Sequence, residues 1–401
     1  MAVFAAVMTG QGVGAIATIQ VLGDSAEAIL RKVFRSKGEK SFELADGRIV
    51  RGNIVDDGEM IDEVTVGGEG VHTYAVHCHG NPLIVGRIME LLRRQGVQVV
   101  PAEQLLSRIL TDEKNLDSIS IEAKLALTTV KTMEGAAVIT NQVKAGLSER
   151  IRQWQDRLDS MSLEKIAAEA RDILKHSEPA RLIIGGCTIA LAGPPNTGKS
   201  TLLNTLAGRE KAIVSDIRGT TRDWVSAQIH IPPLAATIID TAGLDSGIAA
   251  SASVDQAAQR ASIEIIERAD LILLILDLSQ LASQIAEGLM NKLANRRTIV
   301  VLNKADLPPQ LDPACLPGHL GEMVRISAKQ GSGIDDLIRA IHRACNVADF
   351  DPLTPVAFTD RQKHLLEALQ HRDLKAKVRS ILSELSESAS LGTGGRFPAE
   401  V

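Results

Sequence analysis

The feature that most constrains this chain is the segment Gly193-Pro194-Pro195-Asn196-Thr197-Gly198-Lys199-Ser200, in which Gly-Lys-Ser follows the first glycine after four residues. An apolar run at 188–192, short enough for a buried strand, precedes the segment, and a stretch of helical composition at 201–207 follows it. A strand, a glycine loop and a helix in this order are the context of a phosphate-binding loop. A glycine turn before an ordinary helix is the less specific alternative. The favoured interpretation is a nucleotide-binding α/β domain.

The residue types of this segment follow from phosphate chemistry. Gly193 and Gly198 permit unusual dihedral angles and let backbone N–H groups approach phosphate oxygens. A helix that begins near Lys199 adds the positive end of its dipole. Lys199 is predicted to reach the β- and γ-phosphates, and the Ser200 hydroxyl to hold Mg²⁺. The predicted nucleotide-binding residues of this segment are Gly193, Asn196, Thr197, Gly198, Lys199, Ser200 and Thr201.

Two further segments match the parts of a GTPase that act near the γ-phosphate. Asp240 ends an apolar run, where its carboxylate can hold Mg²⁺, usually through water, and the N–H of Gly243 can meet the γ-phosphate. Thr221 lies in the loop after the predicted helix and can complete the Mg²⁺ shell. We therefore expect Lys199, Thr221 and Gly243 to take part in catalysis.

Two later segments match a guanine-binding site. The carboxylate of Asp306 can accept two N–H bonds from the Watson–Crick edge of guanine, whereas adenine presents the wrong donors. Asn303 is expected to hold this loop, and segment 327–329 can place a backbone N–H at guanine O6. Each motif alone is common on solvated loops, but their order along the chain favours a GTPase. The predicted base-site residues are Asn303, Lys304, Asp306, Ser327, Ala328 and Lys329.

The order of apolar runs predicts how the chain is organised. Short apolar runs at 236–240, 271–277, 298–303 and 324–327 suit the strands of a doubly wound, mostly parallel sheet. One long helix at 116–158 and another at 162–176, with Pro179 marking its end, are expected before this domain, and helical sequence at 359–388 after it. The expected fold is a P-loop α/β GTPase domain inserted in an α-helical domain and preceded by a small α+β domain.

These elements imply four domain ranges. The small α+β domain covers 1–112, with strands near 15–21, 61–66 and 73–78 and an amphipathic helix at 82–95. The helical domain covers 113–182, the GTPase domain 183–345, and the second helical part 346–401, with a disordered tail.

Composition narrows the function classes. The net charge of −5 over 401 residues argues against a broadly basic nucleic-acid binder, and 2% aromatic residues leave few side chains for stacking on single strands. The four cysteines form no Cys-x-x-Cys pair, which favours reduced thiols in the cytoplasm. No signal peptide and no membrane helix are expected.

Two segments have a functional and a structural interpretation. His77-Cys78-His79-Gly80 suggests a metal site, but two histidines do not complete one, so a structural corner is favoured. A basic run in the C-terminal helical region is either a solvated helix face, which is favoured, or a tRNA contact. The basic side chains of that run are Arg361, Lys363, Arg372, Lys375, Lys377 and Arg379.

Taken together, the phosphate segment, residues 214–223 and Asp240-Thr241-Ala242-Gly243-Leu244 resemble the MnmE/TrmE tRNA-modification GTPases. The likeness continues into the N-terminal region through residues 61–64 and 77–80. The resemblance implies a folate-binding N-terminal domain that forms a homodimer, and a helical domain that carries the GTPase domain. It also implies joint action with a FAD-dependent MnmG-like partner on the wobble uridine of tRNA.

The resemblance also implies how GTP is hydrolysed. Leu244 stands where other GTPases keep a water-positioning glutamine. In the family, K⁺ supplies the positive charge of an arginine finger and is held by a phosphate-loop asparagine, here Asn196, and by carbonyls of the following loop, here 214–221. The residue aligned with the family's water-orienting glutamate is Asp255, which is one methylene shorter, so slow hydrolysis is expected.

Three departures from the family keep a second hypothesis open. Gln20 stands where the family carries arginine, residues 67–73 replace an acidic segment, and the final residues lack the family's cysteine motif. The first two weaken the expectation that 5-formyl-tetrahydrofolate binds, although Glu103 and Arg108 match family positions. The chain is thus either a K⁺-stimulated GTPase of tRNA modification, or a divergent GTPase switch in regulation or RNA assembly without the modification chemistry.

Overall fold

The computed structural model describes residues 2–10, 12–37, 47–112, 116–209, 225–240, 264–281, 293, 295–371 and 374–387. They form two compact units, one up to Leu125 and the other over Ala126–Ser386. The finer division into four domains stays a prediction. In the described part of the chain, no helix combines the length and the apolar character needed to cross a membrane.

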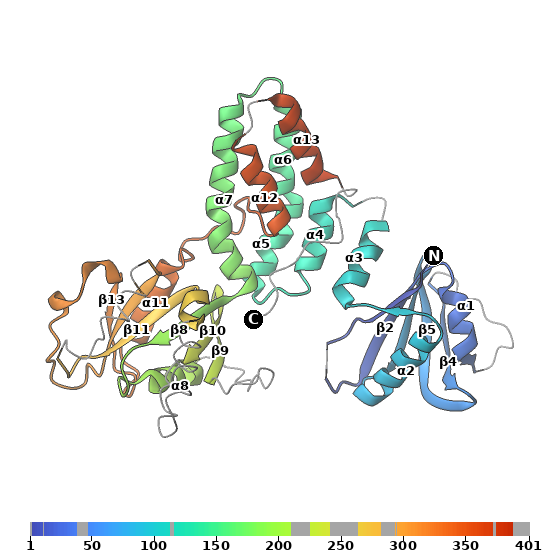
Figure 1. Ribbon diagram of the computed structural model, residues 1–401, viewed down its shortest axis with the longest axis horizontal. Coiled ribbons are helices and arrows are strands. Elements are labelled where there is room, and N and C mark those ends of the chain that lie inside the picture. Colours follow the sequence, from blue (N-terminus) through green and yellow to red (C-terminus); the bar gives the residue numbers. More distant parts are fainter. Residues whose placement is uncertain are drawn as a thin grey trace. The chain divides into compact units, whose positions relative to one another are not determined.

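The first unit is an α+β sandwich built on a seven-stranded sheet (Figure 1). The strands are β1 (Phe4–Val7), β2 (Ile16–Leu22), β3 (Phe34–Ser36), β4 (Ile49–Asp56), β5 (Glu59–Gly70), β6 (Thr73–His79) and β7 (Gln98–Val99), in the order β3-β4-β5-β6-β2-β1-β7. The helices are α1 (Ala26–Val33), α2 (Pro82–Arg94), α3 (Ala102–Asp112) and α4 (Ser118–Ala126). Alternate residues of β2 are buried, and Ile19 and Val21 share one core with Leu92 of α2. The predicted strands and the helix after them are present within one to four residues of their expected bounds.

The second unit contains a six-stranded sheet in the order β13-β12-β11-β8-β10-β9. Its strands are β8 (Cys187–Ala192), β9 (Val225–Ile231), β10 (Leu234–Asp240), β11 (Leu271–Asp277), β12 (Thr298–Asn303) and β13 (Met323–Arg325). All pairs in this list are parallel except β9 with β10. Every residue of β11 and β12 is buried, as expected where both faces of a parallel sheet are covered.

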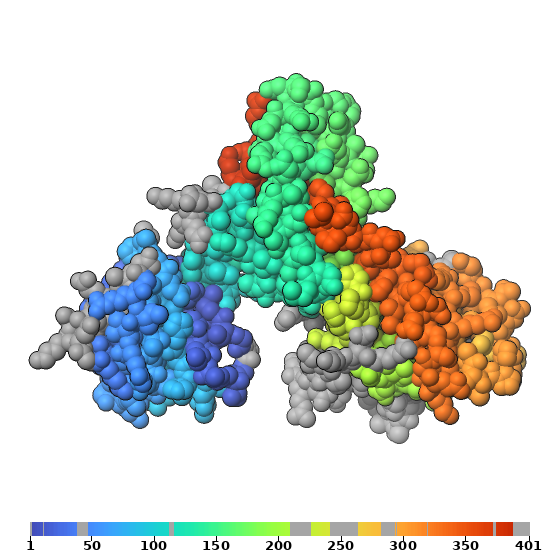
Figure 2. All heavy atoms as spheres, turned by 180° about the vertical axis from the view of Figure 1, so that it is seen from behind, coloured from blue at the N-terminus to red at the C-terminus, as the bar shows by residue number. Residues whose placement is uncertain are grey.

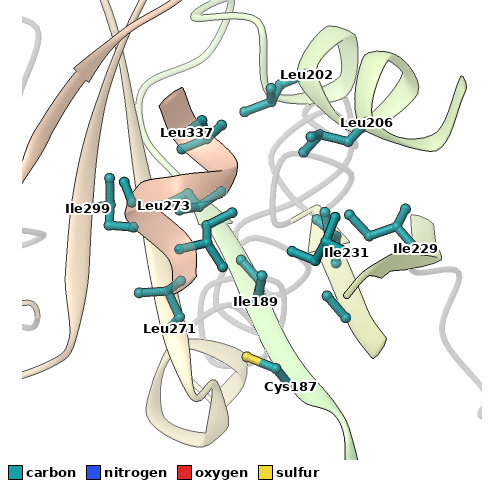
Figure 3. Packing of buried hydrophobic residues seen from close by; sticks show 14 of the residues in the cluster. Cys187, Ile189, Leu202, Leu206, Ile229, Ile231, Leu271, Leu273, Ile299 and Leu337 are labelled. Atoms are coloured by element: carbon teal, nitrogen blue, oxygen red, sulfur yellow. The ribbon is translucent and has the colours of Figure 1, made fainter. Parts of the chain in front are cut away.

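Helices α8 (Lys199–Arg209) and α11 (Ile334–Ala344) contribute to the core on one face of this sheet. Figure 3 shows Leu202 and Leu206 of α8 and Leu337 of α11 gathered over Ile189 and Leu273. The prediction of a doubly wound, mostly parallel α/β GTPase domain is confirmed.

The remaining helices of this unit are α5 (Met133–Lys144), α6 (Leu147–Arg157), α7 (Leu163–Gly185), α12 (Asp360–Leu369) and α13 (Lys375–Ser386). Although α12 and α13 follow the GTPase domain in sequence, they pack on α7 and α6, and Figures 1 and 2 show them in red beside the green helices. The chain thus leaves the helical part, builds the sheet and returns, as an inserted domain requires.

The prediction of one helix over 116–158 is wrong, because the segment forms α4, α5 and α6. Thr132 starts α5 by accepting a bond from the N–H of Gly135 at 2.8 Å. Gly146 separates α5 from α6, and a Cβ there would overlap the amide of Gln142. The helical sequence predicted at 359–388 forms two helices, α12 and α13. The predicted tail lies outside the described residues.

The prediction that Pro179 marks the end of its helix is wrong. Pro179 lies inside α7, which continues to Gly185. Proline costs a helix one backbone bond. Pro179 is buried, and its neighbour Ala180 packs with Val138 and Val356, so packing on this face offsets the lost bond. The helix ends at Gly186, whose φ of 87° suits glycine.

Gln142 fastens the returning chain to the helical part. Its buried amide nitrogen donates to the carbonyl of Thr354 at 3.1 Å, and its oxygen accepts from the N–H groups of Val356 at 2.9 Å and Leu147 at 3.0 Å. The hydroxyl of Ser177 accepts from the N–H of Ala357 at 2.8 Å. The segment after the GTPase domain is therefore held to both α5 and α7.

Candidate functional site

The phosphate loop connects β8 to α8 at the carboxyl end of the sheet, where open α/β sheets bind ligands. Gly193 has a φ of 140°, and a Cβ there would overlap the carbonyl oxygen of Ile275. Gly198 has a φ of 95°, and a Cβ there would overlap the side-chain amide of Asn303. The two glycines are therefore required by the backbone angle and by close packing.

Lys199 begins α8 with its side chain folded over this loop. Its ammonium donates to the carbonyls of Gly193 at 2.7 Å and Pro194 at 2.8 Å, and only 3% of the residue is exposed. The hydroxyl of Thr197 donates to the Pro194 carbonyl at 2.9 Å. A positive charge is thus placed over the loop, beside the positive end of the helix dipole.

The predicted Mg²⁺ ligands Ser200 and Asp240 are brought together from two elements. The Ser200 hydroxyl, on the first turn of α8, donates to the Asp240 carboxylate at the end of β10 over 2.7 Å. Asp240 is 3% exposed. A hydroxyl and a carboxylate are hard oxygen donors, so the pair fits a Mg²⁺ ion beside the phosphate loop.

The predicted base-binding segments meet at the ends of β12 and β13. The Asn303 amide donates to the carbonyl of Thr197 at 2.8 Å and accepts from the N–H of Ala328 at 3.0 Å. Asn303 therefore holds the phosphate loop and segment 327–329 together. The Ala328 carbonyl also accepts a bond from Thr205 of α8 at 2.8 Å.

Asp306 is exposed beside these segments, and its carboxylate accepts a bond from the Ser327 hydroxyl at 2.6 Å. That bond, with a backbone bond and the nearby ammonium groups of Lys329 and Lys304, lowers the pKa of Asp306. The carboxylate is therefore ionised at neutral pH, as acceptance of two N–H bonds from guanine requires.

Sequence reasoning did not single out Asp277, which ends β11 and is 1% exposed. Its carboxylate pairs with the Lys304 ammonium at 2.6 Å and accepts from the N–H and hydroxyl of Ser279 at 2.9 and 2.7 Å. Burial raises the pKa of Asp277, but the bonds from Lys304 and Ser279 outweigh it, so the pKa is lowered. The available signal was its place at the end of an apolar run, which it shares with Asp240.

We expect Asp277→Asn to destabilise the fold by about 1–3 kcal/mol, because the half-buried Lys304 ammonium loses its charged partner. A pKa that is lower in the folded chain stabilises the fold above the unfolded value, about 3.9, and this contribution is lost as the pH falls through the folded value. Denaturant unfolding should therefore show a gap between variant and parent at pH 7 that narrows below about pH 4. Asp159→Asn, at an exposed ion pair with Arg379, is the matched control. A gap independent of pH would contradict this account.

Three predicted residues, Thr221, Gly243 and Asp255, lie outside the described residues. Asn196 lies exposed in the phosphate loop with a φ of 63°. Thr201 lies exposed in the first turn of α8.

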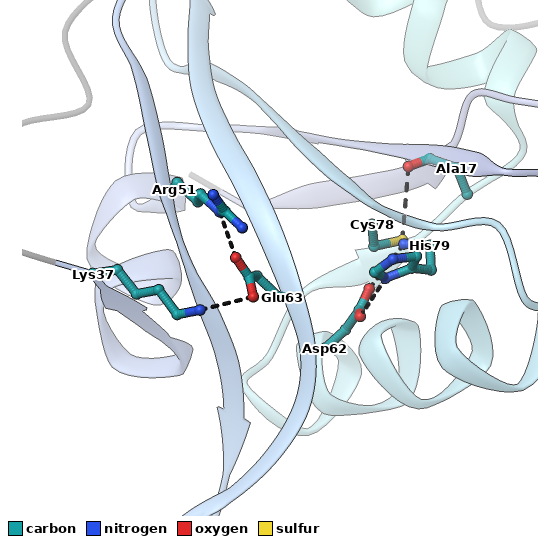
Figure 4. A network of polar contacts seen from close by, with 7 residues as sticks. All are labelled: Ala17, Lys37, Arg51, Asp62, Glu63, Cys78 and His79. Carbon is teal, nitrogen blue, oxygen red and sulfur yellow. Dashed lines mark hydrogen bonds and ion pairs between the residues drawn. The ribbon is translucent and has the colours of Figure 1, made fainter.

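Hydrogen bonds hold the segment His77–Gly80 in the first unit, and Figure 4 shows those of Cys78 and His79. His79 is anchored to the buried carboxylate of Asp62 through its ring Nδ1 at 2.7 Å and its backbone N–H at 2.8 Å. The His77 ring contacts the Thr18 hydroxyl at 3.0 Å. Burial, with Asp62 nearby, raises the pKa of Cys78 to about 11. Across the described ranges, no cluster of three metal-ligating side chains occurs.

Two residues at positions related to folate binding in the family, Gln20 and Arg108, contact other side chains of the chain. The amide nitrogen of Gln20 donates to Glu69 at 2.5 Å, while its buried oxygen has no hydrogen-bond partner among the residues that the structure describes. The Arg108 guanidinium lies over the ring of Phe4, 4.0 Å from its centre.

Three side chains of the C-terminal basic run form hydrogen bonds or an ion pair within the helical part. The Lys375 ammonium donates to the carbonyl of Asp159 at 2.7 Å, Arg379 pairs with the Asp159 carboxylate at 3.0 Å, and Arg361 donates to the carbonyl of Glu384 at 2.9 Å. A tRNA contact by this run stays a prediction.

Two family models match the chain, one in each unit. Residues 3–104 match the GTP-binding protein TrmE N-terminus, and residues 188–304 match the 50S ribosome-binding GTPase. The first match falls on the N-terminal sheet, and the second covers the phosphate loop, Asp240 and Asn303.

Relatives match over almost the whole chain. The tRNA modification GTPase MnmE of Thermotoga petrophila is 29% identical over 95% of this chain and 90% of its own length. The protein of the same name from Geobacter metallireducens is 29% identical over 97% and 90%. The solved G domain of the T. maritima FeoB iron transporter is 26% identical over 39% of this chain and 98% of its own, with a TM-score of 0.32.

The two family models, in this order along the chain, coincide with the N-terminal sheet and with a phosphate loop and base-binding segments that suit guanine nucleotides. The chain is an enzyme that binds and hydrolyses GTP, and along both units it is similar to the MnmE/TrmE family of GTPases.

Proposed function

We propose that this GTPase acts in the modification of tRNA at the wobble uridine. The observation that carries the proposal is the match to relatives named tRNA modification GTPase MnmE, which extends through both units rather than the GTPase domain alone. The alternative, a GTPase switch without modification chemistry, is not favoured, because the N-terminal unit matches the TrmE N-terminus.

The described residues have three roles in GTP hydrolysis: contact with the phosphates, binding of Mg²⁺ and binding of the base. Lys199 brings positive charge to the β- and γ-phosphates from the first turn of α8. Ser200 and Asp240 would hold Mg²⁺, which neutralises phosphate charge when bound. Asp306 orients the base and so fixes where the γ-phosphate lies.

K⁺ is proposed as the activating cation, with Asn196 as one ligand. Its side chain is exposed in the phosphate loop, and an amide oxygen suits an alkali cation. We expect Asn196→Gly to remove the K⁺ stimulation of hydrolysis while GTP binding persists. Glycine is the sharper choice because the φ of 63° would strain alanine. Turnover is measured in K⁺ and in Na⁺. A variant that retains the parent's K⁺/Na⁺ ratio would contradict the assignment.

Asp255 is proposed to orient the attacking water. We expect Asp255→Ala to lower turnover about tenfold, since a positioned base contributes more than this in most enzymes, and to leave GTP affinity unchanged. Asp255→Glu restores the longer side chain and should raise turnover above that of the parent. Single-turnover hydrolysis with a separate binding titration tests both variants. Unchanged turnover in the alanine variant would exclude this role.

Folate is a poorer fit to this chain than GTP and Mg²⁺. The carboxylates of a folate favour a cationic partner. Gln20 carries no charge and is bonded to the acidic Glu69. We therefore route no step of the proposed modification through 5-formyl-tetrahydrofolate.

The remaining parts of the proposal concern partners and location. By its family, the chain would act as a homodimer in the cytoplasm, together with an MnmG-like FAD protein and tRNA. Size measurement in solution and copurification with the MnmG-like protein from the same source test these points.

The experiment that tests the modification role is nucleoside mass spectrometry of tRNA from a bacterial strain that lacks MnmE. This chain is expressed there with the MnmG-like protein from the same source, so that a mismatch of partners does not cause a negative result. The expected result is return of the modified wobble uridine, and no return with Lys199→Ala. Absence of the modification, with GTP hydrolysis intact in the purified protein, would overturn the proposal in favour of a GTPase switch.

A further inference from the structure

Two cysteines meet where the chain enters and leaves the GTPase domain. Cys187 is the first residue of β8, directly after α7 and Gly186. Cys345 is the residue at which α11 ends, just before the chain returns toward α12. Their Sγ atoms are 3.9 Å apart, although 158 positions separate the residues in sequence. The chain crosses between the helical part and the sheet at two places, one at Cys187 and one at Cys345. The sulfur atoms of the two cysteines bring these two crossings into contact.

The two thiols differ in their surroundings. The hydrogen bond between the two Sγ atoms and the nearby Arg297 guanidinium lower the pKa of Cys345 despite its burial. The same hydrogen bond and burial raise the pKa of Cys187. Thiolate character is thus concentrated on Cys345, with Cys187 as the protonated neighbour.

Two surface hollows lie next to residues that neighbour the cysteines in sequence. One, of about 340 Å³, is lined by Asp270, Arg296 and Arg297 among others, and the N–H of Thr188, next to Cys187, donates to Asp270 at 2.8 Å. The other, of about 380 Å³, is lined by Arg297 and by Ala344, next to Cys345. The cysteines themselves are 2% and 1% exposed, so only a small oxidant is expected to react with them.

We propose that Cys187 and Cys345 are a redox modification site, which a peroxide converts into a disulfide that ties together the two crossings of the GTPase domain. The proposal does not depend on the role in tRNA modification.

The reaction balances with hydrogen peroxide as the oxidant. The Cys345 thiolate attacks one peroxide oxygen and the O–O bond breaks, which gives a sulfenic acid and hydroxide. The Cys187 sulfur then attacks the sulfenic sulfur, the S–O bond breaks, and a second hydroxide leaves. With the two thiol protons, the products are one disulfide and two waters. Each sulfur loses one electron, and peroxide takes up both.

The disulfide would act at the opposite end of β8 from the nucleotide. Cys187 begins this strand of six residues, and the phosphate loop follows its other end, about 20 Å away at 3.3 Å per residue. GTP affinity should therefore change little. The link would instead hold the returning segment after Cys345 against the start of β8, and so restrict motion of the sheet relative to the helical part.

The test uses the full chain with Cys315→Ser, which removes the exposed cysteine and so prevents links between molecules. The protein is treated with hydrogen peroxide, digested without reduction and analysed by mass spectrometry. The expected product is a peptide pair joining Cys187 to Cys345, lighter by two hydrogens and separated again by dithiothreitol. Cys187→Ser and Cys345→Ser should each abolish it. In the Cys187→Ser variant, a sulfenic acid trapped by dimedone at Cys345 is expected.

A second measurement follows the consequence of the link. Amide hydrogen exchange at 346–349 should slow in the oxidised protein and recover on reduction, while GTP affinity stays within about twofold. The proposal is overturned if peroxide leaves both thiols reduced, or if Cys78 is oxidised in their place. It is also overturned if the disulfide appears only after the protein is unfolded, which a parallel sample in denaturant shows.

Discussion

Lys199→Ala is expected to weaken GTP binding about 100-fold or more. Removal of one partner from a buried charge pair costs about 3–5 kcal/mol, and each 1.4 kcal/mol is a factor of ten in affinity. Lys199 is buried, and its ammonium folds over the phosphate loop beside the start of α8. Without it, the β- and γ-phosphates would face a loop with backbone dipoles alone. The measurement is titration with a fluorescent GTP analogue, followed by single-turnover hydrolysis.

The same ammonium bonds the carbonyls of Gly193 and Pro194, so its loss also disturbs the loop. Thermal unfolding of the nucleotide-free protein separates that effect from the loss of phosphate binding. Lys175→Ala, at an exposed position of α7, is the control for removal of one positive charge. If the Lys199 variant binds GTP as tightly as the control, the assignment of the phosphate site is wrong.

Asp306→Asn is expected to reverse the base preference of the enzyme from guanine to xanthine. The Asp306 carboxylate can accept from both N1–H and the 2-amino group of guanine, whereas an amide presents its own NH₂ to one of these donors. Xanthine has a carbonyl at position 2, which can accept from that NH₂. A site built around such bonds rejects the wrong partner strongly, and we expect GTP affinity to fall roughly 100-fold or more.

Competition between GTP and xanthosine triphosphate for the variant measures this change directly. Asp312→Asn is the matched control, because Asp312 is an exposed carboxylate that caps a short helix, and asparagine caps equally well. Equal loss of both nucleotides would show that Asp306 only supports the loop through Ser327. Undiminished preference for GTP would place the base elsewhere.

The motifs of the nucleotide site could be read from sequence because each is local. The dihedral angles of Gly193 and the position of Asp240 at a strand end depend on residues near them in the chain. Asp277 was missed because its role depends on the parallel pairing of β11 with β12, which brings Asp277 opposite Asn303 and next to Lys304. No short pattern contains that pairing.

The helical part shows a different limit. Composition predicted helix across 116–158, but the breaks depend on single contacts, such as the close approach of Gly146 to Gln142. Pro179 predicts a helix end when it is read locally, yet tertiary packing keeps α7 continuous through it. Propensity gives the kind of element, and long-range packing gives its bounds.

The Gln142 bonds have a consequence for the modular history of the chain. These bonds fasten Thr354 and Val356 to α5, and Ala180 of α7 packs with Val356. The helical part therefore holds together, by its own contacts, the segments before and after the inserted GTPase domain. A folded module whose ends are close can be accommodated at such a place with little loss of chain entropy. At this position, a GTP-hydrolysing domain could therefore be acquired or exchanged without changes to the surrounding helices.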